Sequence, residues 1–282
     1  FNTRQLNRDY PLGGFAGNQI DTLRDAGYLS GAPGDVSDLP FHVAPDETLA
    51  SLEARIRSYI AVNCAYCHQS GGGNPSNWDG RPELSLQHTG LINGLLNNTG
   101  GDAANRLVVP GDSGHSVMLS RIEASGGFGR MPPLASIELD QTAIDLMQEW
   151  IDDELPLTYQ TYAEWRFANF GSTNSAAGDP TFDFDSDGRN NEFEWLTRTD
   201  PKNMADVWQS GIASDGLGGL ELNFDWVLNR TLEIEESTNL VDWTLLDDPA
   251  NHGFPSAITN SEVLSFPAPV SPSRFYRFRI WE

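Results

Sequence analysis

The sequence predicts a multidomain protein with an all-α domain, then an acidic loop, then a small all-β C-terminal domain. The 282 residues suffice for about two domains at the usual ~150 residues each. Apolar residues recur at helical spacing up to about residue 157, whereas short alternating runs bounded by turn signals begin near residue 205. We therefore expect an N-terminal extension (1–45), a helical domain (46–157), a linker helix with the acidic loop (158–204) and a β-sandwich-like module (205–282).

Composition and charge exclude several classes of function. With 39% hydrophobic and 20% charged residues, the chain is expected to fold as a globular protein. Its 17 Lys and Arg against 40 Asp and Glu give a formal net charge of −23, which disfavours nucleic acids and anionic membrane surfaces and favours basic partners and divalent cations. No apolar run approaches the ~20 residues of a membrane helix, so we expect no membrane span.

The two cysteines of the chain lie in one pentapeptide, Cys64-Ala65-Tyr66-Cys67-His68. This C-x-x-C-H pattern is typical of covalent haem attachment. Two thiols at this spacing can add to the two vinyl groups of one porphyrin, and the adjacent imidazole can then bind the iron. A zinc site would need two further ligands at matching spacing, and a thioredoxin-like site would need a preceding strand. The motif therefore predicts one covalent haem c, attached at Cys64 and Cys67, with His68 as an axial ligand.

The segment before the motif is expected to be a helix. Asp46 or Thr48 is a suitable N-cap. An apolar stripe at three- and four-residue steps follows, formed by Leu49, Leu52, Ile56, Tyr59 and Ile60. Such a helix would deliver both thiols to a buried macrocycle, which indicates a class I-like cytochrome c domain over 46–157.

The second axial ligand is expected to be Met131. It precedes Pro132 and Pro133, which exclude helix and hold the methionine on a stiff loop. Met118 and Met147 lie in helical patterns, where core packing is expected, and Met204 lies far beyond in another region. The possible histidine ligands, each expected to be an ordinary polar or surface residue, are His42, His88 and His115. A further helix, with Asp140 as N-cap and Pro156 as its end, should pack across the first.

Several runs resemble a family of secreted bacterial multidomain cytochrome c proteins, common in Planctomycetes and Verrucomicrobia. They are Asn77-Trp78-Asp79-Gly80-Arg81, Val108-Val109-Pro110-Gly111-Asp112, Met131-Pro132-Pro133 and Glu149-Trp150-Ile151. The opening run from Asn2 to Asp9 is similar to that family as well. The resemblance covers about 1–157 and implies that 1–45 belongs to a larger upstream region. It assigns no role to the insertion 69–107.

The acidic loop matches the twelve-position calcium pattern from Asp183 to Glu194. The expected ligands of one Ca²⁺ are Asp183, Asp185, Asp187, Arg189 through its carbonyl, Asn191 through water, and Glu194. A solvated acidic turn is the alternative. The loop is EF-hand-like, but the preceding helical segment ends too early and no second loop follows. It resembles the single loops of dockerin-like or thrombospondin type 3 repeats, so we expect a structural clamp that braces the junction.

The C-terminal region should form short strands, with Leu220, Leu222 and Phe224 on one face of the first. It resembles a small β-module at the ends of secreted verrucomicrobial proteins. A stabilising cap and a docking or surface-attachment module both remain open as its role.

These observations predict an electron carrier rather than an enzyme: one-electron transfer through a haem with His68 and Met131 as axial ligands, as part of a larger secreted redox protein. The acidic surface would steer a basic redox partner. The alternatives are a peroxidase-like haem enzyme with a labile distal ligand, served by His115 or Arg130, and a surface or adhesion protein with an accessory haem.

Since haem is attached outside the bacterial cytoplasm, we expect a periplasmic, extracellular or cell-surface location in a Gram-negative bacterium. Because the chain begins at Phe1 with no visible signal peptide, we expect a processed protein or a piece of a longer one.

Overall fold

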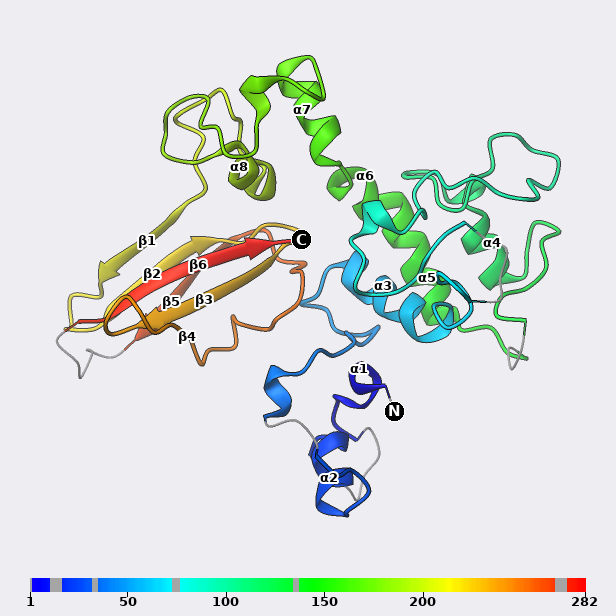
Figure 1. The fold of residues 1–282 in the computed structure, drawn as a ribbon, viewed down its shortest axis with the longest axis horizontal. Coiled ribbons are helices and arrows are strands. Elements are labelled where there is room, and N and C mark those ends of the chain that lie inside the picture. Colours follow the sequence, from blue (N-terminus) through cyan, green and yellow to red (C-terminus); the bar gives the residue numbers. More distant parts are fainter. Residues whose placement is uncertain (1, 11–16, 32–34, 73–76, 134–136, 267–272) are drawn as a thin grey trace.

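The computed structural model combines short helices with two small antiparallel sheets (Figure 1). It describes residues 2–10, 17–31, 35–72, 77–133, 137–266 and 273–282. The helices are α1 (Thr3–Leu6), α2 (Gln19–Asp25), α3 (Leu52–Asn63), α4 (Val117–Glu123), α5 (Gln141–Glu149), α6 (Leu155–Thr158), α7 (Tyr162–Phe170) and α8 (Asn191–Thr197). Within the described residues, no helix is both long and apolar enough to cross a membrane.

The strands all lie after residue 205 and form two three-stranded sheets. One has the order β1-β2-β5 and the other β4-β3-β6. Their bounds are β1 (Ser210–Ser214), β2 (Leu220–Asp225), β3 (Thr231–Ser237), β4 (Thr244–Leu245), β5 (Ser261–Phe266) and β6 (Phe275–Trp281). Leu222 and Phe224 of one sheet share an apolar cluster with Leu232 and Ile234 of the other, so the sheets bury their inner faces against each other.

Helices α3 and α5 form the centre of a second apolar cluster. Ile56 and Ile60 from α3 are fully buried and pack with Ile144, Met147 and Ile151. The expected packing of the later helix across the first is confirmed. Asp140 is the N-cap of α5, as expected, because its Oδ1 accepts a hydrogen bond from the Ala143 backbone N–H at 3.1 Å.

Two predicted helix limits are wrong. The N-cap of α3 is Ser51, whose Oγ accepts from the Ala54 N–H at 3.1 Å, and not Asp46 or Thr48. The chain before it forms turns instead of a helix, since the Ala50 N–H donates to the Glu47 carbonyl at 3.2 Å, and Ala50 itself forms an isolated bridge with Ser256. At the other end, Pro156 does not stop the last helix. A π-helical segment (Trp150–Glu154) leads into α6. Pro156 lies in the first turn of α6, where a helix tolerates a residue that has no backbone N–H to donate.

Glu154, at the end of that π-helical segment, caps the start of α3. Its carboxylate accepts hydrogen bonds from the backbone N–H groups of Leu52 at 2.8 Å and Glu53 at 2.7 Å. These are two of the donors that a helix start leaves without a partner in its own helix. Glu154 is only 6% exposed, so water is a poor substitute for it.

Replacing Glu154 with alanine should therefore lower the free energy of unfolding by about 2 kcal/mol, the usual cost of losing hydrogen bonds to a buried charged group. Urea unfolding followed by circular dichroism measures this loss. Asp153→Ala, at the exposed neighbouring position, is the control and should change the stability little. Equal stability of both variants would contradict the capping role.

The helical part and the sheets meet at the start of α3. The Ser51 N–H donates to the Pro255 carbonyl at 2.8 Å, and the Ser51 Oγ–H donates to Asn229 Oδ1 at 2.8 Å. Asn229 Nδ2 in turn donates to Glu53 Oε2 at 2.7 Å. Figure 1 shows the sheets on one side of this contact and α3 to α6 on the other.

The predicted fold class is wrong. We expected a multidomain chain with an all-α class I-like cytochrome c domain, an EF-hand-like calcium loop and a small all-β C-terminal domain. The chain is instead a mixed structure in which short helices and small sheets share contacts. The described segment between α3 and α4 is largely irregular, with isolated bridges between Ile92 and Val108 and between Arg106 and Ser116. Its many glycines and asparagines disfavour helix, which explains why this region did not become a helical bundle.

Candidate functional site

The C-x-x-C-H motif lies in the turn that follows α3. The backbone N–H groups of Cys67 and His68 donate to the Cys64 carbonyl at 3.1 and 2.9 Å. This turn brings both thiols and the imidazole into one short segment at the end of α3, which buries Ala54, Ile56 and Ile60. Both cysteines are free thiols of intermediate burial.

The chemistry of Cys64 argues against a redox-active pair. Burial, followed by the nearby Cys67, raises the pKa of the Cys64 thiol to about 12. Reactive C-x-x-C pairs depend on a thiol whose pKa is lowered. Cys64 is therefore held as a neutral thiol, which makes it a poor nucleophile for disulfide exchange.

The imidazole of His68 is positioned by Trp78 and Gly80, which follow it in the sequence. It stacks on the indole of Trp78 with ring centroids 4.1 Å apart and an interplanar angle of 17°. The Gly80 N–H donates to the His68 carbonyl at 2.8 Å. Burial, together with the positive charge of Arg121, lowers the pKa of His68, so the ring is neutral at neutral pH and can bind a metal through nitrogen.

Gly80 is required for the close approach of this loop to the motif. A Cβ at this position would lie 3.0 Å from Ile60 Cγ2 and 3.4 Å from the Ala65 Cα. Next to it, Asp79 accepts hydrogen bonds from Arg81 Nη2 at 2.7 Å and from the Ser70 N–H at 3.2 Å. The bond from Arg81 is the main reason why the pKa of Asp79 falls to about 2. Sequence reasoning assigned no role to these residues, although the resemblance included their run.

Met131 lies beside the motif. Its backbone N–H donates to the Arg121 carbonyl at 3.0 Å, and it lines a cavity of about 300 Å³ together with Asn63 and Tyr66. Asn63 directly precedes Cys64, and Tyr66 stands between the two cysteines. His68 is not one of the described residues that line this cavity, so the structure brings Met131 next to the motif but not face to face with the imidazole.

The motif and the cavity carry different parts of a haem site, because Cys64, Cys67 and His68 hold the donor atoms and none of them is among the described residues that line the cavity. Two thiols and a neutral imidazole are the donor set that covalent haem attachment needs. The Nε–H of Arg130, another lining residue, is buried and has no partner among the described residues. A haem propionate would supply the missing acceptor.

The rival axial ligands occupy other surroundings. Met118 and Met147 are buried in the cluster around α3 and α5, as expected, and Met204 is 65% exposed. His115 is held by Asp112, with Nδ1 and Oδ2 2.6 Å apart, and by Asp102 at 3.6 Å. His88 Nδ1 lies 2.7 Å from the Ser85 hydroxyl, and His42 lines a different cavity.

The acidic loop places three of its predicted ligands together. Asp183, Asp185 and Asp187 each offer a carboxylate oxygen, and these oxygens lie within 4.8 Å of one another. Backbone N–H groups hold these carboxylates in place, from Ser186 to Asp183 Oδ1 at 2.7 Å and from Arg189 to Asp187 Oδ1 at 2.6 Å. Gly188 has φ +94°, the conformation that the sharp turn of a calcium loop requires.

Glu194, on α8, is buried at this loop without a counter-charge. It is 1% exposed, and neither of its carboxylate oxygens has a partner among the described residues. Burial and then the negative charges of Asp185, Asp187, Asp183 and Asp200 raise its pKa to about 7. One oxygen each of Asp185 and Asp187 is likewise buried and unpaired within the described part of the chain. These orphaned acceptors are what a bound cation would satisfy.

The side chain of Asn191 makes two contacts that the calcium pattern does not predict. Its Nδ2 donates to the carbonyls of Ala177 and Asp179 at 3.0 and 2.8 Å, so this side chain fastens the preceding segment. Its Oδ1 is buried without a partner among the described residues. Only this oxygen could still reach a water on the cation.

The loop and α8 also connect the two halves of the chain. The guanidinium of Arg198, just after α8, donates to the carbonyls of Leu157 at 2.8 Å and Leu228 at 3.1 Å. The indole N–H of Trp195 donates to the Gln160 carbonyl at 3.2 Å. These contacts come from α8 and Arg198, so the bracing role of the acidic loop itself stays a prediction.

Comparisons with protein-family models, with curated proteins and with solved structures gave no match.

Proposed function

We propose that this protein carries one covalent haem c and transfers single electrons. Cys64 and Cys67 would hold the porphyrin, and His68 would bind the iron on one face. The observation that carries the proposal is the motif at the end of α3, with two free thiols and a neutral imidazole stacked on Trp78.

Met131 is proposed as the second axial ligand. Its thioether lies on the loop that lines the cavity next to the motif. When bound, the haem supplies an iron that alternates between two oxidation states, and methionine ligation raises its reduction potential. The protein's own contribution is to exclude water from the iron and to hold the imidazole through Trp78 and Gly80.

The redox partner and the location of the protein are also part of the proposal. The net charge of −23 suits a basic redox partner protein or domain. Haem attachment and a calcium loop both fit the periplasm, the cell surface or the extracellular space of a Gram-negative bacterium, within a larger secreted redox protein.

A haem enzyme with a labile Met131 is the second candidate. The observation in its favour is that polar side chains, Tyr59, Arg130 and Asp140, line the same cavity as Met131. Such groups could serve a substrate at an open iron position.

The visible absorption spectrum of the purified protein, oxidised and reduced, with and without carbon monoxide, separates these functions. A low-spin c-type spectrum that does not respond to carbon monoxide is expected for the electron carrier. A high-spin or responsive spectrum would favour the enzyme. The double variant Cys64→Ala/Cys67→Ala should lose the haem stain on a denaturing gel, and absence of haem from the unmodified protein would refute both candidates.

A further inference from the structure

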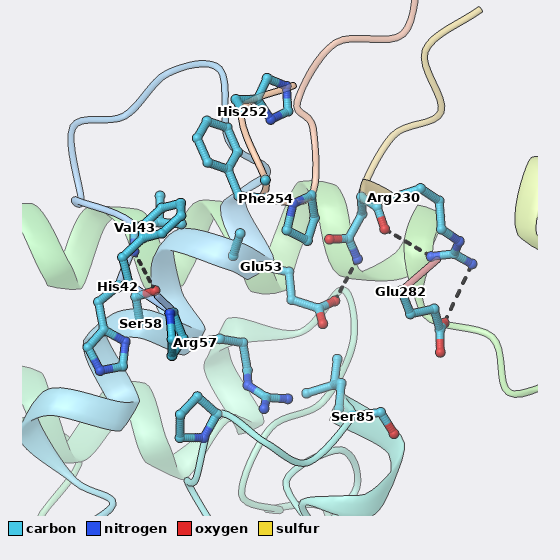
Figure 2. Close-up of a pocket in the computed structure, with 18 of the residues that line it drawn as sticks. His42, Val43, Glu53, Arg57, Ser58, Ser85, Arg230, His252, Phe254 and Glu282 are labelled. Carbon is cyan, nitrogen blue, oxygen red and sulfur yellow. Dashed lines mark hydrogen bonds and ion pairs between the residues drawn. The ribbon is translucent and has the colours of Figure 1, made fainter. Parts of the chain in front are cut away.

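The junction between the helical part and the sheets has little apolar packing. Each part has its own apolar cluster. A third and smaller cluster joins them, and it consists of Ala50, Ala54 and Phe254, with Val43 packed against it. Beside it, a cavity of about 600 Å³ lies between the first half of α3 and the loops of the β-sheets (Figure 2). Parts of a chain that meet over a small interface can move relative to each other, so the polar contacts across this junction are important.

Arg198, which directly follows α8, contacts both parts. Its guanidinium donates to the carbonyl of Leu157 in α6 at 2.8 Å and to the carbonyl of Leu228, between β2 and β3, at 3.1 Å. Its backbone has φ +62°, a left-handed conformation that glycine adopts most readily at a helix end. An arginine at a position that favours glycine indicates that its side chain has a role.

Trp195, within α8, also contacts both parts. Its indole N–H donates to the carbonyl of Gln160, after α6, at 3.2 Å. The guanidinium of Arg230, which precedes β3, lies over the indole at 5.3 Å from the ring centroid. Helix α8 therefore links the helical part to the sheets through two of its side chains.

The same helix carries Glu194, whose side chain faces the acidic loop. This side chain is 1% exposed, neither of its oxygens has a partner among the described residues, and the negative charges of the three loop aspartates act on it. Its backbone carbonyl accepts hydrogen bonds from the N–H groups of Arg198 and of Thr199, the latter at 3.1 Å. Glu194 thus connects the aspartates to the residue that spans the junction.

We infer that Ca²⁺, bound by the three loop aspartates and Glu194, fixes α8 in the position from which Arg198 and Trp195 hold the helical part against the sheets. Without the cation, repulsion among four carboxylates opposes this position of Glu194. The acidic loop and α8 together form a calcium-dependent joint. Because the two equilibria are linked, the contacts of Arg198 must in turn strengthen Ca²⁺ binding. The inference does not depend on the haem.

Calorimetric titration of the full chain with Ca²⁺ tests this coupling. The unmodified chain should bind one Ca²⁺, and Arg198→Gly should bind it at least about threefold more weakly. Glycine suits the left-handed backbone here, so this variant loses the side chain without strain at the helix end. Loss of a positive charge would by itself strengthen cation binding, so the joint and a general charge effect predict opposite results. Leu240→Gly is the matched control, because Leu240 is also left-handed, with φ +62°, and is 58% exposed in the β-module.

Hydrogen exchange followed by mass spectrometry gives a measurement that needs no variant. Ca²⁺ should slow exchange at least about twofold in the acidic loop and also in segments 157–160 and 227–231 at the junction. In Arg198→Gly the effect should persist in the loop and disappear from segment 227–231. Circular dichroism verifies the fold, and Arg198→Asn replaces the glycine variant if that variant does not fold.

Several results would overturn the inference. They are no Ca²⁺ binding at millimolar concentration, equal or tighter binding in the Arg198 variant, an equal weakening in Leu240→Gly, and junction exchange that does not respond to Ca²⁺. Each of these results can occur with an unchanged haem spectrum, so failure of the joint is distinguishable from failure of the proposed electron transfer.

Discussion

Replacing Met131 with alanine is expected to leave the haem attached but to open one face of the iron. Cys64, Cys67 and His68 are unchanged in this variant, so the covalent bonds and one axial ligand should persist. Alanine offers no ligand atom, and the oxidised spectrum should therefore change from low-spin to high-spin. The reduced variant should bind carbon monoxide at once, and its reduction potential should fall because the methionine ligand raises it. Visible spectroscopy and redox titration measure these changes.

Met118→Ala is the informative control for this variant. Met118 is 7% exposed and packs in the cluster around α3, so its loss should cost about 2–5 kcal/mol of stability and leave the spectrum unchanged. Met204→Ala, at a site that is 65% exposed, should change neither. An unchanged spectrum in Met131→Ala would pass the ligand role to another residue, with Met118 the first to test. A spectrum that already responds to carbon monoxide before any substitution would favour the haem enzyme.

Local features of the fold could be predicted because they depend on nearby residues. The apolar stripe that contains Ile56 and Ile60 specifies the buried face of α3, and the side chain of Asp140 specifies the start of α5. Likewise, Gly188 takes the positive φ that the calcium pattern demands.

The remaining features depend on contacts between residues far apart in the sequence. The N-cap of α3 is Ser51 and not Asp46 or Thr48. Its backbone N–H and its hydroxyl donate hydrogen bonds to Pro255 and Asn229, which belong to the C-terminal part of the chain. Glu154, 102 residues away from Leu52, completes the helix start. No periodicity in the sequence reports such pairs. The class I-like fold was wrong for the same reason, since motif spacing says nothing about how the intervening segments pack.

The candidate sites differ in the same way, since some consist of neighbouring residues and others depend on distant contacts. The motif and the aspartates are contiguous in sequence, so their members could be named from spacing alone. The stacking of Trp78 on His68 joins residues at a spacing that no helical or strand period pairs. A cavity of about 600 Å³ is lined by residues far apart in the sequence, such as Arg57 and Arg230, and their sequence positions give no signal of it.

Removal of calcium is expected to destabilise the protein, and Glu194 should control how that effect depends on pH. A cation that binds only the folded state stabilises it by about 2.7 kcal/mol at 100 times its dissociation constant, which corresponds to roughly 5 °C or more in melting temperature for a chain of this size. Without calcium, the ionised form of Glu194 is disfavoured by its burial and by the three aspartates, and its pKa rises from 4.5 to about 7. The stability contributed by the protonated form is thus present below pH 4.5 and lost as the pH rises through 7.

In chelator the melting temperature should therefore fall as the pH rises between about 4.5 and 7. With calcium it should fall less, because the cation replaces the proton on Glu194, so the difference between the two curves should widen over this interval. Glu194→Gln removes the titrating group and should flatten the chelator curve while abolishing most of the gain from calcium. Glu192→Gln, at an exposed position two residues earlier, should behave like the unmodified protein. A calcium effect that is independent of pH, or equal in both variants, would mean that Glu194 does not bind the cation and that the aspartates act alone.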